Sequence, residues 1–90
     1  MTKLLWDASF KRSYKKRVSH NLLLKKKFWE ALELFTHNPF DKQLKTHRLT
    51  GKLKGLWALS IDYDCRIVFK FLKQTSEVLL IDIGSHDEVY

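Results

Sequence analysis

Apolar residues near the start of the chain recur with the period of a helix. Phe10, Tyr14 and Val18 step by four residues along one face. Asp7 or Ser9 precedes this stripe and offers a side-chain oxygen for the first backbone amides of a helix. The cationic residues between the apolar positions fill the remaining surface: Lys11, Arg12, Lys15, Lys16 and Arg17. The pattern predicts a short amphipathic helix with a basic outer face.

A second helical stripe follows after a break at residues 19–21. It consists of Leu24, Phe28, Ala31, Leu32 and Phe35. Pro39 disfavours helical backbone at the residue before it, so this helix should end around residues 37–38. Because the break between the two stripes is so short, the two helices should form an antiparallel hairpin.

The second half of the chain changes to the two-residue period of strands. Residues 38–55 are loop-like, and apolar and polar residues then alternate over 57–62, 66–71 and 79–83. Turns are expected at residues 62–64 and 74–76. With a first short strand at residues 3–6, the chain predicts an α+β fold. A strand, a helix hairpin and a three-stranded meander would form a mainly antiparallel sheet of about four strands, with the helices on one face.

Length and composition limit the classes of protein that the chain can belong to. Ninety residues suit a single domain spanning residues 1–90, and 44% hydrophobic residues suit a globular one. No stretch approaches an uninterrupted membrane span. Cys65 is the only cysteine, so no disulfide framework is possible and a reducing cytoplasm is the expected compartment.

Charge is distributed unevenly along the chain. Residues 1–55 carry fourteen lysines and arginines against four acids, whereas residues 56–90 carry three against six. A concentrated basic half implies a polyanionic partner, an acidic protein partner, or both. Lys11 and Lys15 belong to the densest run, which a solvated surface would also explain. The scarcity of acids beside them favours a binding face.

Two of the four histidines follow or precede predicted strands. His47 opens the loop that leads into the first strand of the meander, and His86 follows its last strand. His20 and His37 lie at helix boundaries, where exposed or capping roles explain them. No pair of histidines or cysteines has metal-ligand spacing, so a metal site is not expected. Cys65 fits best as a small strand residue.

These residue types match the needs of RNA cleavage without a metal or other cofactor. RNA supplies its own nucleophile, the 2′-hydroxyl, so the protein must provide a base, an acid and cations for the charged phosphorane. Histidine serves as base or acid near neutral pH. Arg66, Lys52 and Lys54 offer phosphate-binding cations, and the glycines on either side of the lysines allow a flexible cradle.

Several stretches, in this order and spacing, resemble the RelE/ParE toxin superfamily, and most closely its YafQ/RelE-like mRNA interferases. They are Ser9 to Lys16, His47-Arg-Leu-Thr-Gly51, Gly55, Asp62-Tyr-Asp-Cys-Arg-Ile-Val-Phe69 and Ile83-Gly-Ser-His-Asp-Glu-Val-Tyr90. The resemblance covers essentially the whole chain. It implies the toxin of a bacterial type II toxin–antitoxin pair, an endoribonuclease that cuts mRNA in the ribosomal A site and is neutralised by an acidic antitoxin.

The resemblance also implies roles for four residues. His47 matches a catalytic histidine, assigned here as general base, and His86 matches the C-terminal catalytic histidine, assigned as general acid. Asp64 matches a catalytic aspartate that orients a histidine or serves as base itself. Arg66 matches an arginine common in the superfamily, which would stabilise the phosphorane.

Further positions follow from the same resemblance. Tyr90 stands where the family has a C-terminal aromatic residue that can stack on a base. Ser60 departs from the pattern, because it occupies a position where YafQ has a further active-site histidine. The lysines of the first helix and of the loop would bind mRNA and rRNA: Lys11, Lys15, Lys52 and Lys54.

Two other functions are compatible with such a chain. The same superfamily includes ParE toxins, which inhibit DNA gyrase and cut no RNA. The joint presence of His47, Asp64 and His86 argues against that alternative, since an inhibitor needs no acid–base groups. A basic nucleic-acid-binding module without activity is the third possibility, and it predicts salt-sensitive binding without a cleavage product. The codon cut and the stoichiometry with the antitoxin are not encoded in any recognisable pattern.

Overall fold

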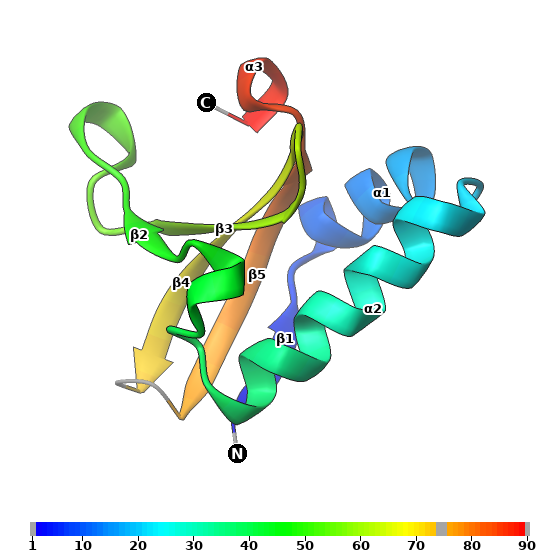
Figure 1. The fold of residues 1–90 in the computed structure, drawn as a ribbon. Helices are drawn as coiled ribbons and strands as arrows, with labels where there is room; N and C mark the ends of the chain where they lie inside the picture. Colours follow the sequence, from blue (N-terminus) through cyan, green and yellow to red (C-terminus); the bar gives the residue numbers. More distant parts are fainter. Residues whose placement is uncertain (1, 74–75, 90) are drawn as a thin grey trace.

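A computed structural model describes residues 2–73 and 76–89, and its larger elements are labelled in Figure 1. In chain order these are β1 (Lys3–Trp6), α1 (Ala8–Arg17), α2 (Leu22–His37), β2 (His47–Arg48), β3 (Trp57–Asp62), β4 (Cys65–Lys73), β5 (Glu77–Gly84) and α3 (His86–Val89). Two short 3-10 helices, η1 (Lys42–Leu44) and η2 (Gly51–Leu53), lie on either side of β2. No helix among the described residues is long and apolar enough to cross a membrane.

The described strands form a sheet in the order β1-β5-β4-β3-β2. β1 runs parallel to β5, and the other neighbours are antiparallel. This arrangement confirms the predicted α+β class and the mainly antiparallel sheet. About four strands were predicted, and the additional one is β2 (His47–Arg48), which lies in a stretch predicted to be loop. Two residues are too short to show an alternating pattern, so only pairing with Trp57 and Ala58 reveals this strand.

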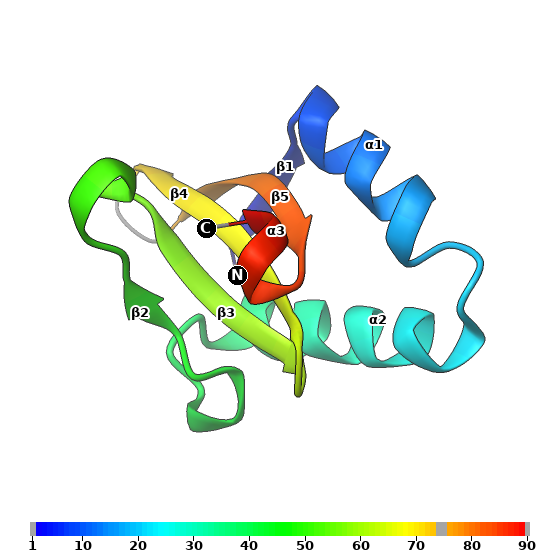
Figure 2. The same ribbon diagram turned by 90° about the horizontal axis from the view of Figure 1, so that it is seen from above.

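α1 begins directly after Asp7, one of its two predicted caps, and α2 begins directly after the predicted break at residues 19–21. The Asp7 carboxylate accepts a hydrogen bond from the Ser9 backbone N–H, and the Asn21 side chain accepts one from Leu24. α2 ends at His37, as predicted. The helices connect as a hairpin whose arms diverge, because α1 contacts β5 while α2 reaches β3 (Figure 2).

One continuous core lies between these helices and the sheet. Fully buried side chains from α1 and α2, such as Phe10, Phe28 and Phe35, meet Phe69 and Leu80 from the strands. Burying a large aromatic side chain contributes about 1.5–3 kcal/mol, so this cluster carries much of the stability of the domain. It also fixes the sheet on which the polar residues of the other face stand.

β5 departs from the simple alternation of its sequence. Leu79, Ile81 and Ile83 alternate along the chain, but Val78, Leu80 and Ile83 are the fully buried apolar residues of the strand, while Leu79 and Ile81 are half-buried. The register with β4 shifts here, since Val68 pairs with Asp82 and the next residue pairs with Leu80. A β-bulge adds one residue to a strand and exchanges the faces of those beyond it.

Candidate active site

Strand register brings three of the polar residues onto one face of the sheet. His47 pairs with Ala58, and Ser60, two residues further along β3, pairs with Arg66. Directly opposed residues in antiparallel strands project to the same face, as do residues two apart. The side chains of His47, Ser60 and Arg66 therefore share a face. The core residues Leu59 and Ile67 alternate with them and point to the other one.

Asp64 joins this face to the end of the chain. It lies in the turn between β3 and β4, where its Oδ1 is 3.5 Å from Nη1 of Arg66. The same oxygen accepts a hydrogen bond from the backbone N–H of His86 at 3.4 Å. The structure thus places Asp64, Arg66 and His86 in mutual proximity, although Asp64 and His86 are far apart in sequence.

Arg66 has unused hydrogen-bonding capacity. Its Nη1 atom is buried and has no hydrogen-bond partner among the described residues, since the contact with Asp64 is a long ion pair. A buried unpaired donor is costly, and a charged one more so. An anion that reached this nitrogen would remove that cost. Arg66 is therefore a suitable group to hold a phosphate oxygen.

His47 is oriented by the backbone. Its Nδ1 lies 2.9 Å from the carbonyl oxygen of Lys45. A carbonyl oxygen only accepts hydrogen bonds, so Nδ1 carries a proton and Nε2 is the acceptor of the neutral ring. The side chain is exposed at the edge strand. This arrangement fits a general base that takes a proton through Nε2.

α3 holds His86 through a network around Glu88. One carboxylate oxygen of Glu88 accepts a hydrogen bond from the Ser85 N–H at 2.7 Å, and the other pairs with Arg17 of α1. The Ser85 hydrogen bond, and then the positive charge of Arg17, lower the pKa of Glu88. Gly84 packs against the side chain of Glu88, because a Cβ added at residue 84 would lie only 3.1 Å from Glu88 Oε1. Nδ1 of His86 is itself 3.6 Å from the Asp87 carboxylate.

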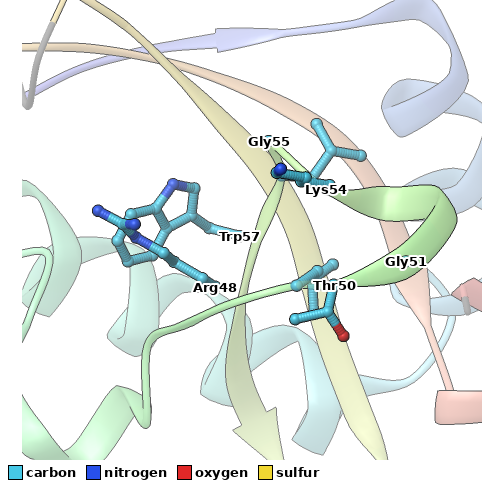
Figure 3. A pocket seen from close by; sticks show the side chains of 8 residues that line it. Arg48, Thr50, Gly51, Lys54, Gly55 and Trp57 are labelled. Carbon is cyan, nitrogen blue, oxygen red and sulfur yellow. The ribbon is translucent and has the colours of Figure 1, made fainter.

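The two loop lysines do not share one phosphate cradle. Lys52 lines a hollow of about 440 Å³ together with His47. Lys54 lines a different hollow of about 600 Å³ with Arg48 and Trp57 (Figure 3). A third hollow of about 350 Å³ includes Arg66, and its lining also contains Gln43, Lys45 and Ser60.

The remaining predicted site residues lie elsewhere. Lys11 and Lys15 are exposed on α1, which lies on the opposite side of the molecule from β2 in both views (Figures 1 and 2). Tyr90 lies outside the described residues. Cys65 is buried, and desolvation raises the pKa of its thiol to about 11, as suits an inert strand residue.

Sequence reasoning missed Arg48. Its guanidinium carbon lies 5.1 Å from the centre of the Trp57 ring, a cation–π contact across the β2–β3 pair. The signal was weak, because Arg48 follows His47 in a stretch without alternation. Within residues 2–73 and 76–89, no group of three or more histidine, cysteine, aspartate or glutamate side chains could hold a metal ion.

Comparisons with known proteins agree over the length of the chain. A family described as "Bacterial toxin of type II toxin-antitoxin system, YafQ" matches residues 2–90. A copper-bound mutant toxin from Helicobacter pylori is 30% identical, with full coverage of both chains and a TM-score of 0.74. No curated protein sequence matches significantly.

Two more distant structures share the fold. YafQ from E. coli strain BL21(DE3) is 17% identical, with a TM-score of 0.71 over 100% of this chain and 99% of that one. The YoeB–YefM complex from Staphylococcus aureus contains a chain that is 18% identical, with a TM-score of 0.75 over 96% of this chain and 98% of that one.

Proposed function

Because the chain belongs to the YafQ family of bacterial type II toxin–antitoxin toxins, we propose that it is an endoribonuclease that cuts mRNA in the A site of translating ribosomes. The observation that carries this proposal is the strand register, which gathers His47, Ser60 and Arg66 on one face beside Asp64 and His86. The reaction would take place in the cytoplasm, and its partners would be mRNA and rRNA.

Cleavage begins at the 2′-hydroxyl of the nucleotide before the cut. Nε2 of His47 takes the 2′-OH proton, and the 2′-oxygen attacks the adjacent phosphorus. Arg66 donates hydrogen bonds to the phosphorane through the nitrogen that lacks a partner among the described residues. His86 gives a proton to the departing 5′-oxygen. The products are a 2′,3′-cyclic phosphate and a 5′-hydroxyl, so atoms and charge balance.

Asp64 and Ser60 complete the proposed site in different ways. The carboxylate of Asp64 holds the guanidinium of Arg66 and the backbone of His86 in one place, which fits an orienting role. Ser60 stands beside Arg66 where a histidine would offer a further acid–base group. A hydroxyl can hydrogen-bond to a phosphate oxygen, but unlike histidine it does not change its protonation state near neutral pH. The chemistry therefore rests on two histidines.

An acidic antitoxin is the proposed protein partner. The chain carries a formal net charge of +7, and α2 exposes apolar side chains near its beginning, with Leu22 83%, Leu23 63% and Trp29 49% exposed. A hollow of about 500 Å³ between β1 and α2 includes Leu4 and Trp6 beside Trp29. Exposed apolar groups rimmed by cations suit an amphipathic acidic segment. The S. aureus YoeB–YefM complex shows that a toxin of this fold is held by another protein.

The proposal is tested by mapping mRNA 5′ ends in a translating extract. Wild-type protein should produce new ends on ribosome-bound mRNA. His47→Gln and His86→Gln should each slow cleavage by about 10²–10⁴-fold, the usual contribution of a general acid or base. Lys26→Gln, which removes an exposed charge from α2, serves as the matched control and should cut at the wild-type rate.

Gyrase supercoiling measured in the same preparations distinguishes the ParE-like alternative. Inhibition of gyrase by the wild type and both histidine variants, with no mRNA cleavage, would replace the proposed function by that of a gyrase inhibitor. Salt-sensitive RNA binding without cleavage or inhibition would leave only a nucleic-acid-binding module.

A further inference from the structure

The connection between β2 and β3 contains a hollow that the proposed cleavage chemistry does not use. It has a volume of about 600 Å³ (Figure 3). Its lining combines two cations, a hydroxyl and apolar side chains: Arg48, Lys54, Thr50, Leu49, Leu56 and Trp57. Ligand sites in proteins commonly show this composition, an apolar wall with a few polar groups placed around it.

Arg48 is held in position before any ligand arrives. Its guanidinium lies over the Trp57 ring at 5.1 Å. That ring is fixed in turn, because Phe40 and Phe71 contact it at centroid distances of 5.6 and 5.2 Å. A side chain that is already ordered loses less conformational entropy on binding. The planar guanidinium therefore offers a prearranged surface on which a flat group can stack.

The backbone keeps the hollow open. The Leu49 N–H donates a hydrogen bond to the Leu56 carbonyl at 2.9 Å, which closes the hairpin beneath it. Gly51 and Gly55 have φ values of +67° and +97°, and no atom lies within 4 Å of where either Cβ would stand. Positive φ is readily adopted by glycine, so these residues make the turns without side chains at the rim.

The hollow is continuous with the proposed active site. It shares Arg48, Leu49 and Thr50 with the hollow lined by His47 and Lys52. His47 and Arg48 are successive residues of the edge strand β2, so their side chains point to opposite faces of the sheet. A strand of RNA that crosses this edge would place neighbouring nucleotides in the two hollows.

We propose that the hollow holds an unpaired base of the RNA substrate, next to the phosphate that is cut. The base stacks on the guanidinium of Arg48 and contacts the apolar wall of Leu49 and Leu56, while Lys54 holds its phosphate. Proteins that read single-stranded RNA stack bases on aromatic rings or arginine planes in this way. The site would give the protein a preference for certain bases beside the cut. That the ligand is RNA rests on the proposed function.

The mixed lining favours a nucleotide over a simple anion. Two cations alone would suit any phosphate, but an inorganic phosphate would bury no apolar surface against Leu49 and Leu56 and so would gain no hydrophobic stabilisation from them. A nucleobase uses both features, because its flat face stacks while its phosphate pairs with Lys54. The described hollow is also wider than a phosphate group requires.

The test is a titration of the purified protein with each of the four nucleoside 5′-monophosphates, followed by ¹H–¹⁵N NMR. The indole N–H signal of Trp57, assigned with Trp57→Phe, and the Gly51 and Gly55 amides should shift and saturate in the millimolar range. Inorganic phosphate should leave them nearly unchanged. Arg48→Gln should weaken binding about tenfold, since stacking on the guanidinium is lost. Lys26→Gln should bind as the wild type does.

The outcomes separate this inference from the proposed function. Mononucleotides are not cleaved, so binding is measured whether or not the protein cuts mRNA. Equal shifts with inorganic phosphate, or unchanged affinity in Arg48→Gln, would overturn the base site even if cleavage is observed. Nucleotide binding without mRNA cleavage by the wild type would overturn the proposed function and leave the base site standing. Arg48→Gln should also change which base is preferred beside the cut, which a merely destabilised protein would not do.

Discussion

Arg66 illustrates how a single residue can be prepared for a ligand. Its buried nitrogen has no hydrogen-bond partner among the described residues, and Asp64 approaches it only to 3.5 Å. An unsatisfied charged donor usually costs more than about 1–3 kcal/mol. The proposed site could bear such a cost, because the charge of Arg66 would be satisfied when the proposed phosphorane forms.

Cys65 shows the opposite case, a reactive type of residue kept inert. Burial raises the pKa of its thiol from 9.0 to about 11. The fraction present as thiolate near neutral pH therefore falls about a hundredfold, and the thiolate is the form that reacts. We expect iodoacetamide to label Cys65 in the folded protein at least about a hundredfold more slowly than in urea, as measured by mass spectrometry. Fast labelling of the folded protein with loss of activity would identify Cys65 as a functional thiol.

Among the elements, α3 is tied to the rest of the fold by a charged side chain. It is short and exposed, and Glu88 ties it to Ser85 and to Arg17 of α1. A helix of this length has little stability of its own. The orientation of His86 therefore depends on these contacts.

The Glu88 contacts predict a dependence of stability on pH. Because the pKa of Glu88 is lowered from 4.5 in the folded state, its stabilising effect is complete above that value and is lost as the pH falls through the lower, folded-state pKa. Glu88→Gln should be less stable than the wild type near neutral pH, and the difference should vanish in strong acid. Urea unfolding at both pH values measures this. Glu30→Gln, an exposed acid on α2, should show no such change; an equal difference at both pH values would exclude the charge of Glu88 as the cause.

The elements also show where sequence patterns suffice. Periodicity and capping residues predicted the large helices and the strands of the meander, since those signals are local. β2 and the bulge in β5 escaped prediction, because pairing across the sheet determines them. For the site, the resemblance to a toxin family pointed to His47, Asp64 and His86. The proposed role of Arg48 depends on its contact with Trp57. The two residues are separated in sequence by the turn, so the contact forms only when the hairpin folds.

At the scale of the whole molecule, the lysines proposed to bind RNA lie on two separate sides. Lys52 lies with His47 near β2, whereas Lys11 and Lys15 stand on α1 across the molecule (Figures 1 and 2). One segment of RNA in the proposed site would not contact both groups. On the ribosome, the α1 lysines would bind a different stretch of RNA backbone, and their contribution would be to affinity alone.

This separation predicts different effects for the two groups of lysines. The double variant Lys11→Gln/Lys15→Gln should weaken ribosome binding and reduce the slope of log affinity against log salt by about 1.4–1.8, for two phosphate contacts. Its cleavage rate on saturated ribosomes should equal that of the wild type. Lys52→Gln should lower both binding and that rate. A loss of rate at saturation in the α1 variant would mean that the helix takes part in positioning the substrate.

The place of β5 in the sheet has a consequence for how the protein is made. β5 is the last of the described strands along the sequence, yet it lies between β1 and β4, and only Ser85 separates its end from His86. During synthesis, the first strand has no partner and the sheet cannot close until residues 77–84 have left the exit tunnel, since contacts between distant segments form late. Folding and the arrival of the proposed general acid therefore coincide. A nascent copy would therefore lack the complete proposed site until residues 77–86 have emerged and β5 has paired with β1 and β4.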